Sequence, residues 1–264
     1  MDDNFLRQAD RQLTGWLDPV ARLRAALEKN ELELYAQPIR KIPNGAFPMA
    51  EVLVRLREEE SALLPPGEFL PVFEHFHMMP QLDRWVVRHA IRRLASGSKV
   101  ARLTIHVSAQ TLEDAEFPRF VAGELMESRV AASSLLFEID EPDVLGRPQA
   151  AERFASALKT IGLGVMIDGF GRRAASFAPI KALRPDFIKV DGSITRRVLS
   201  SPAAEGKLKA IVRVGEAAGF GVVAECVEEQ DILLRLKALG VGYAQGFGIF
   251  RPHPLASIAA SAPA

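Results

Sequence analysis

Polar side chains suited to holding a cation recur in this sequence at or near the ends of short apolar runs. Glu138 lies near the end of one run, Asp168 near the end of the next, and Glu225 near the end of a third. Carboxylates gathered in one place repel one another unless a metal ion, a lysine or a proton compensates their charge. Their oxygen atoms are the ligands that hard cations prefer. We therefore expect the carboxylates to form a cation site, or the descendant of one, at the place where these residues meet: Glu51, His106, Glu138, Asp168, Lys189, Glu225 and Gln245.

Each of these residues, taken alone, also has an ordinary structural explanation. A single charged residue at a strand end is more often half of an ion pair than a catalytic group. Glu51 and Arg55 flank the apolar run 52–54, and a buried strand excludes charge unless that charge is paired or functional. Recurrence at successive strand ends favours a functional role for the set.

The apolar runs alternate with longer amphipathic stretches, which is typical of βα units around a mainly parallel sheet. We predict strands at 32–39, 49–56, 103–108, 135–140, 164–170, 186–191, 221–227 and 242–247. We predict helices at 82–95, 147–162, 204–219 and 230–240. A chain of 264 residues can form one α/β barrel, so the predicted fold is α/β, a modified (β/α)₈ barrel of the TIM type. In such a barrel the carboxyl ends of the strands meet at one mouth.

The two ends of the chain depart from this regular pattern. Only the short connection 40–48 separates the first two strands, so we expect them to form an antiparallel hairpin. We expect residues 1–20 to form a helix that leads in from an upstream domain. The barrel is predicted to span 21–256, and the Ala-rich and Ser-rich tail 257–264 is expected to fray.

Charge and composition exclude several classes of function. The chain has 33 basic and 33 acidic residues, so no global field attracts it to nucleic acid or to an anionic membrane. No apolar run approaches the roughly 20 residues of a membrane span, and the first residues do not resemble a targeting signal. The single cysteine, Cys226, excludes a disulfide within the chain. We expect a soluble cytoplasmic protein that binds no nucleic acid and does not insert into membranes.

Ordered motifs from about residue 20 to residue 254 resemble those of the EAL domain family. They are LYAQPI at 34–39, EVLVR at 51–55, PPGEFLPVFE at 65–74, HVSAQTL at 106–112, FEIDE at 137–141, IDGFG at 167–171, FIKVD at 187–191, AECVE at 224–228 and YAQGF at 243–247. The resemblance implies cyclic di-GMP as the ligand and a barrel whose first strand is antiparallel. Active members of the family hydrolyse one phosphodiester bond of this nucleotide with two Mg²⁺ or Mn²⁺ ions.

The resemblance also assigns the members of the cation site, with two departures from the pattern of active members. His106 replaces an asparagine ligand, and Gly169 replaces a second aspartate. Imidazole suits Zn²⁺ or Ni²⁺ better than Mg²⁺, so packing or hydrogen bonding is the simpler role for His106. We therefore expect no bound metal, no required cofactor and no phosphodiesterase activity. The vestigial residues on this interpretation are Glu51, Glu138, Asp168, Lys189, Glu225 and Gln245.

The loop after Asp168 reads GRRAASFA at 171–178, which replaces a glycine-containing loop of the family. Two interpretations of Arg172 and Arg173 stay open. Either they offset the charge of the acidic cluster, or they face solvent, where arginines contribute little. Glu141, which matches the residue that anchors this loop in the family, is able to pair with either of them.

Ligand recognition resembles the family more closely than catalysis does. The residues expected to bind cyclic di-GMP are Gln37, Leu53, Arg55, Asp83, Glu225 and Gln245. Arg55 can present a fork of N–H donors to a phosphate oxygen, and Leu53 is expected to face a guanine. Asp83 is expected to accept from guanine N–H groups, although an acid early in a helix is also favoured by the helix dipole.

These features together resemble the FimX-type receptor EAL domains. We expect a cyclic di-GMP receptor that signals through a protein partner, with a PilZ-domain protein as one candidate and type IV pilus or twitching motility as the setting. A GGDEF domain is expected upstream. Two alternatives remain: a weak phosphodiesterase that depends on Mg²⁺ or Mn²⁺, and an interaction module that no longer binds nucleotide. Retention of Gln37, Arg55 and Asp83 argues against the second alternative.

Overall fold

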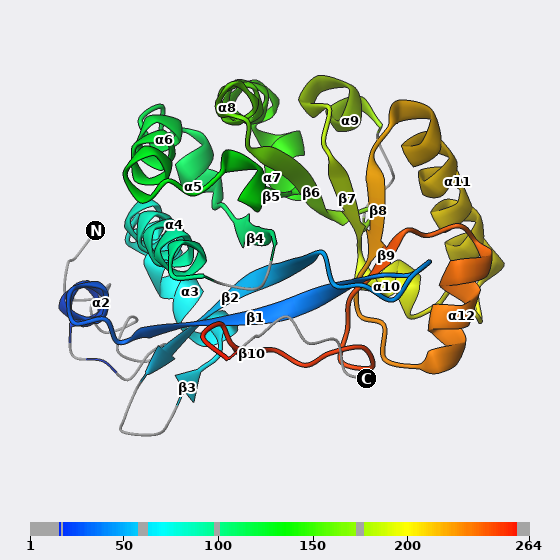
Figure 1. Ribbon diagram of the computed structural model, residues 1–264, viewed down its shortest axis with the longest axis horizontal. Coiled ribbons are helices and arrows are strands. Elements are labelled where there is room, and N and C mark those ends of the chain that lie inside the picture. The colour runs from blue at the N-terminus through cyan, green and yellow to red at the C-terminus, as the bar shows by residue number, and fades with distance from the viewer. Residues whose placement is uncertain (1–15, 17, 58–62, 98–100, 173–176, 258–264) are drawn as a thin grey trace, which may run out of the picture.

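The computed structural model describes residue 16 and residues 18–57, 63–97, 101–172 and 177–257 (Figure 1). Helix α2 (Pro19–Glu28) precedes the first strand, and the Asp18 side chain caps it by accepting a hydrogen bond from Ala21 N at 3.0 Å. The predicted helix at 1–20 and the predicted tail at 257–264 lie almost wholly outside the described residues, so both stay predictions.

The strands close into a barrel in which one strand runs against the others. Strand β1 pairs antiparallel with both β2 and β9, whereas the remaining barrel neighbours pair in parallel. The pairing of β1 with β2 completes the ring and confirms the predicted hairpin and the modified barrel. The barrel strands are β1 (Leu32–Lys41), β2 (Met49–Arg57), β4 (Leu103–His106), β5 (Leu135–Asp140), β6 (Gly164–Phe170), β7 (Phe187–Val190), β8 (Gly221–Ala224) and β9 (Tyr243–Ala244). Two short strands, β3 (Leu63–Leu64) and β10 (His253–Pro254), extend the sheet beside β2 and β1.

Helices lie outside most of the barrel, whereas the short strand β10 lies beside β1 (Figure 1). Two of the helices, α8 (Pro148–Ile161) and α11 (Pro202–Ala218), are followed by Gly162 and Gly219, which adopt the left-handed conformation that glycine tolerates best. The helices after α2 are α3 (Pro66–His75), α4 (Met79–Ala95), α5 (Ala109–Leu112), α6 (Phe117–Ser128), η1 (Ala132–Ser134), α7 (Glu141–Gly146), α8 (Pro148–Ile161), α9 (Ala178–Leu183), α10 (Gly192–Thr195), α11 (Pro202–Ala218) and α12 (Gln230–Ala238).

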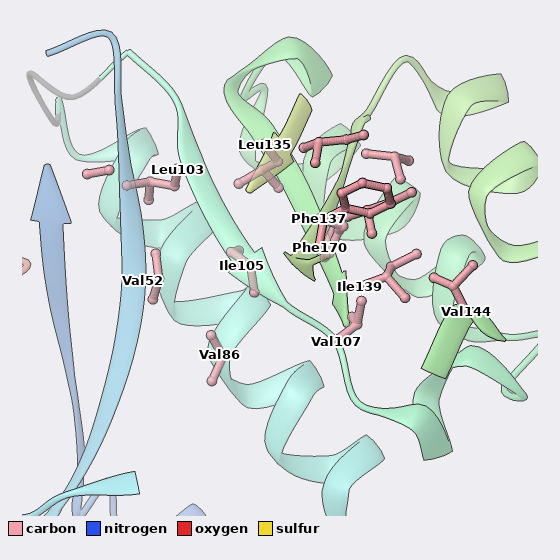
Figure 2. Packing of buried hydrophobic residues seen from close by; sticks show 14 of the residues in the cluster. Val52, Val86, Leu103, Ile105, Val107, Leu135, Phe137, Ile139, Val144 and Phe170 are labelled. Atoms are coloured by element: carbon pink, nitrogen blue, oxygen red, sulfur yellow. The ribbon is translucent and has the colours of Figure 1, made fainter. Parts of the chain in front are cut away.

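Alternating side chains on the strands build two separate apolar clusters. Leu135, Phe137 and Ile139 of β5 belong to the larger cluster, which also contains Val86 of α4 and Val144 of α7 (Figure 2). Successive side chains of a strand point to opposite faces, so these residues pack outward against the helices. Full burial of each such side chain contributes roughly 1.5–3 kcal/mol, which makes this layer the main support of the fold.

The smaller apolar cluster fills the interior of the barrel. Its buried members come from strands all around the ring, so they can meet only inside it: Ile39, Met49, Leu136, Met166 and Val223. Glu51, Glu138 and Asp168 each lie two positions after a member of this cluster, namely Met49, Leu136 and Met166. Because successive side chains of a strand point to opposite faces, the three acids also point into the barrel. The interior therefore has an apolar floor below a polar layer.

The observed bounds match the predicted ones closely for 135–140 and 164–170, and less well near the mouth. The predicted strand 221–227 ends at Ala224, and Cys226 has a φ of 57° that is incompatible with an extended strand. Among the residues that the structure describes, none of the helices has both the length and the apolar character needed to cross a lipid bilayer.

Candidate active site

Lys189 lies at the centre of the polar layer and is 1% exposed. Its Nζ lies 3.0 Å from Glu51 Oε2 and 3.8 Å from Asp168 Oδ1, and it donates a hydrogen bond to Glu138 Oε2. Burial alone favours the neutral amine, but the surrounding carboxylates outweigh it and raise the pKa of Lys189 well above its usual value. Lys189 therefore supplies a permanent positive charge to the acids around it.

His106 ends β4 and lies between two groups of carboxylates. Its Nε2 lies 2.6 Å from Glu51 Oε1 and 3.5 Å from Glu138 Oε2, and its Nδ1 lies 3.7 Å from Asp168 Oδ2. Burial disfavours the imidazolium, but these three acids outweigh it and raise the pKa of His106 to about 10. Without a bound cation, His106 thus adds a second positive charge to the site.

Glu51 lies at the end of a chain of hydrogen bonds that runs through Gln245 and Gln37. Gln245 donates hydrogen bonds from Nε2 to Glu51 Oε2 and, at 3.1 Å, to Gln37 Oε1, and Gln37 Nε2 donates to Phe250 O at 2.8 Å. Burial opposes ionisation of Glu51, but Lys189 and the hydrogen bonds to this carboxylate hold its pKa well below the usual range. Glu51 is therefore a fixed, ionised carboxylate.

Acids on the β5, β6 and β8 side extend the site toward solvent. Glu225 Oε1 accepts a hydrogen bond from Gly192 N at 2.6 Å, and burial together with Asp168 raises the pKa of Glu225 to about 7. Asp140 joins His106 and Asp168 in a group whose ligand atoms all lie within 4.8 Å of one another. Our predicted set omitted Asp140, although it follows Glu138 by two residues and so shares its inner face.

The donor atoms present fit a divalent cation. One ligand atom from each of Glu51, His106 and Glu138 lies within 4.8 Å of the others. Glu138 Oε1 and Gln245 Oε1 are buried and have no hydrogen-bond partner in the described part of the chain. A buried oxygen left without a partner is costly, and a cation beside it removes that cost. The residues that would hold the ion are therefore Glu51, His106 and Glu138, with Asp168 and Glu225 nearby.

At the edge of the mouth, the Arg172 guanidinium lies next to Gly169, where a side chain on residue 169 would project. Gly169 has a φ of 62°, and a Cβ built on it would lie 3.6 Å from Arg172 Nη2. Arg172 Nε donates to Asp191 Oδ2 at 2.6 Å, so Arg172 pairs with Asp191. Glu141 instead accepts a hydrogen bond from Gly171 N at 3.1 Å. Arg173 lies outside the described residues.

A cavity of about 360 Å³ adjoins the acids between β2, α3, α4 and the segment after β4. Leu53 and Asp83 line it, and His106 and Asp140 connect it to the cation site. Asp83 Oδ2 accepts hydrogen bonds from Ser108 N at 3.0 Å and Ser108 Oγ at 2.8 Å. Sequence reasoning missed this link between Asp83 and the segment that follows His106.

Arg55 and Gln37 do not line this cavity. Arg55 Nη1 donates to Val54 O at 2.8 Å, and the guanidinium lies 5.5 Å from the centre of the Tyr35 ring. Burial lowers the pKa of Arg55 from its usual value. The residues predicted to bind the ligand thus fall into three places. Leu53 and Asp83 line the cavity, Gln37 and Arg55 lie on the β1–β2 hairpin outside it, and Glu225 and Gln245 lie in the acidic layer.

Comparisons with known proteins agree with this arrangement. The sequence profile described as "EAL domain" matches residues 20–252. Cyclic di-GMP phosphodiesterase PdeF of Escherichia coli K12 is 32% identical over 248 residues, covering 93% of this chain and 33% of the relative. The structure described as "PaMucR Phosphodiesterase, c-di-GMP complex" has a TM-score of 0.83 at 28% identity and covers 89% of this chain and 97% of that one. The FimX EAL domain from Pseudomonas aeruginosa bound to c-di-GMP has a TM-score of 0.84 at 28% identity and covers 89% and 96%.

Our expectation of lost phosphodiesterase activity is contradicted by these comparisons. PdeF and PaMucR are both named as phosphodiesterases, and this chain spans about a third of the length of PdeF. Glu51, His106 and Glu138 also form a group able to hold a metal, which the sequence led us not to expect. The prediction judged the site by residue types, whereas the positions of the donor atoms decide whether an ion fits. The matched profile, covering 20–252, shows that the chain belongs to the EAL domain family.

Proposed function

We propose that this domain binds cyclic di-GMP and hydrolyses one of its phosphodiester bonds with the help of a divalent cation such as Mn²⁺ or Mg²⁺. The observation that carries the proposal is the ring of acids around Lys189, where Glu51 and Glu138 are held beside an open cavity. PdeF and PaMucR, with the names given above, support the same reaction.

The residues of the chain have distinct roles in this reaction. Glu51, His106 and Glu138 would hold the cation, which supplies an activated water and polarises the phosphate. Lys189 and Gln245 donate hydrogen bonds to Glu51 and fix its orientation. The water oxygen forms a bond to phosphorus, the bond from phosphorus to the ribose oxygen breaks, and the water proton replaces phosphorus on that oxygen.

The cavity beside the acids has the character that a nucleotide base requires. Leu53, Leu82 and Val86 give it apolar walls, and Ser108 and Gln110 add polar groups at its edge. A few polar groups in an apolar pocket fix the orientation of a bound ligand. The PaMucR and FimX structures both contain c-di-GMP, which supports the same ligand here.

The test is incubation of this chain with cyclic di-GMP in Mn²⁺, in Mg²⁺ and in EDTA, followed by chromatography of the nucleotides and calorimetry of binding. We expect linear dinucleotide only with a metal present, and at least a hundredfold less product from the Glu51→Gln variant. Binding without product in every metal would overturn the proposed hydrolysis. Failure to bind at all would favour an interaction module without nucleotide.

The wider setting of the domain stays a prediction. A PilZ-domain partner, a role in type IV pilus or twitching motility, and an upstream GGDEF domain were all inferred from the resemblance of the sequence. The described residues do not identify a partner surface for any of them. Similarity to the FimX EAL domain supports nucleotide binding rather than any particular partner.

A further inference from the structure

We propose that His106 is a metal ligand through its Nε2, and that it makes this site select Co²⁺ and Zn²⁺ over Mg²⁺. The inference deepens the proposed function, since it concerns the cation of the same site. It depends on the placement of one imidazole among the carboxylates.

Distances around Nε2 suit a shared ion. Ligands held about 2.0–2.2 Å from Zn²⁺ in a tetrahedron lie roughly 3.3–3.6 Å apart. His106 Nε2 lies 3.5 Å from Glu138 Oε2 and 2.6 Å from Glu51 Oε1. The first pair already has the required spacing, whereas the second pair must move apart by about 0.7 Å to share an ion.

The other ring nitrogen lies near a carboxylate, which is one of the common partners of the second nitrogen of a histidine ligand. Metal-bound histidines commonly donate their second N–H to an acid, which fixes the tautomer and the ring orientation. His106 Nδ1 lies 3.7 Å from Asp168 Oδ2, and Asp140 lies in the same group. With a metal bound, Nδ1 keeps its proton, and the ion takes the place of the Nε2 proton that lies between His106 and Glu51.

An unpartnered oxygen provides an independent observation. Glu138 is 0% exposed, and Lys189 donates to its Oε2 while its Oε1 has no hydrogen-bond partner in the described part of the chain. The carboxylate therefore has one oxygen, Oε2, that lies near both Lys189 and His106 Nε2, and a second, Oε1, whose capacity to bind an ion is unused. Buried oxygens without partners are rare and call for an explanation such as a bound ion.

Selectivity follows from the ligand type. Mg²⁺ prefers an octahedron of oxygen atoms and loses its waters reluctantly, whereas imidazole suits Co²⁺ and Zn²⁺. A site with one imidazole and two carboxylates therefore favours the later transition metals. Replacing the imidazole with an amide oxygen should reverse much of that preference.

The experiment titrates Co²⁺ into the full chain and records visible absorption, with calorimetry for Co²⁺, Zn²⁺ and Mg²⁺. We expect ligand-field bands in the wild type that shift or weaken in His106→Asn. Affinity for Co²⁺ and Zn²⁺ should fall at least tenfold in that variant, while affinity for Mg²⁺ should not fall. His77→Asn is the matched control, because His77 is exposed and its φ of 54° is one that asparagine tolerates.

Three results would overturn the proposal: equal Co²⁺ affinity in wild type and His106→Asn, tighter Mg²⁺ than Co²⁺ in the wild type, or no metal binding at all. Circular dichroism of the variants excludes misfolding as the cause of a loss. Hydrolysis is scored separately. If Co²⁺ bands depend on His106 but cyclic di-GMP is not hydrolysed, the proposed function is wrong and this inference stands. If cyclic di-GMP is hydrolysed but His106→Asn leaves the preference between Co²⁺ and Mg²⁺ unchanged, this inference is wrong and the proposed function stands.

Discussion

Lys189 and Glu51 reach each other across the full width of the barrel. Lys189 belongs to β7 and Glu51 to β2, and three strands separate β7 from β2 in either direction around the ring. Their side chains nevertheless lie 3.0 Å apart, from Nζ to Oε2. The pair therefore ties opposite walls together as well as compensating charge at the site.

Removal of this lysine should destabilise the fold. Lys189→Met leaves Glu51 and Glu138 without their shared cation in a buried setting, and breaking a buried pair in this way costs about 3–5 kcal/mol. We expect a loss of that order in the free energy of unfolding, measured with urea. Lys209→Met is the control, because Lys209 pairs with Glu205 at the surface and should change stability by less than about 1 kcal/mol. Equal midpoints for the two variants would show that the buried pair is not a structural tie.

Asp83 should act through the segment that follows His106. Its Oδ2 accepts from Ser108 N, Ser108 Oγ and Thr111 Oγ1, and Asp83→Ala leaves Ser108 N and Thr111 Oγ1 without this acceptor, whereas Ser108 Oγ can still donate to Thr111 Oγ1. Each buried donor without a partner costs about 1–3 kcal/mol, so a loss of at least about 2 kcal/mol is expected in thermal or urea unfolding. Asp231→Ala, an exposed acid in the first turn of α12, should cost only a few tenths of 1 kcal/mol. A neutral Asp83→Ala would indicate that these hydrogen bonds do not position the segment.

Filling the cavity should weaken nucleotide binding without unfolding the chain. Leu53 lines the cavity and is half-buried, so a tryptophan there can project into the open space of about 360 Å³. We expect Leu53→Trp to reduce cyclic di-GMP affinity at least tenfold in calorimetry. Leu234→Trp, at an exposed position on α12, should leave the affinity unchanged. Unaltered binding by Leu53→Trp would place the base elsewhere.

Two glycines should respond to alanine in opposite ways. A Cβ on Gly246 would lie 2.2 Å from Val227 O, so Gly246→Ala forces the backbone beside Gln245 to move. Overpacking of this kind costs about 1–3 kcal/mol. Gly206 lies inside α11 with no atom within 4 Å of its built Cβ, and Gly206→Ala should stabilise the chain by roughly 0.5–1 kcal/mol. Urea unfolding of both variants checks these signs, and destabilisation by Gly206→Ala would contradict the account of α11.

The periodic parts of the fold were predictable from the sequence alone. Strand β5 was expected at 135–140 and is found there, because a short apolar run that ends in acids stands between two longer amphipathic stretches. Glycine signals also located the ends of α8 and α11. Because the side chains of a strand alternate between its two faces, the position of Glu138 on the inner face also follows from the sequence.

Features that depend on long-range contacts were not predictable in the same way. Asp83 was interpreted as a ligand-binding residue, and its bonds to Ser108 join segments 25 residues apart. Arg172 was left with two interpretations, either offsetting the charge of the acidic cluster or facing solvent. In the structure it pairs with Asp191, which lies 19 residues away in the sequence, and no local pattern indicates this partner. The error about activity has the same origin, since His106 was judged by its type and not by its distance from Glu51 and Glu138.

The apolar floor of the barrel has a kinetic consequence. Ile39, Met49, Leu136, Met166 and Val223 close the interior below Glu51 and Glu138, so the barrel is a blind pocket and not a channel. Under the proposed function, water and nucleotide therefore reach Glu51 and Glu138 from the mouth of the barrel and not through its apolar end. Slow release of the dinucleotide from the mouth would then delay entry of the next nucleotide.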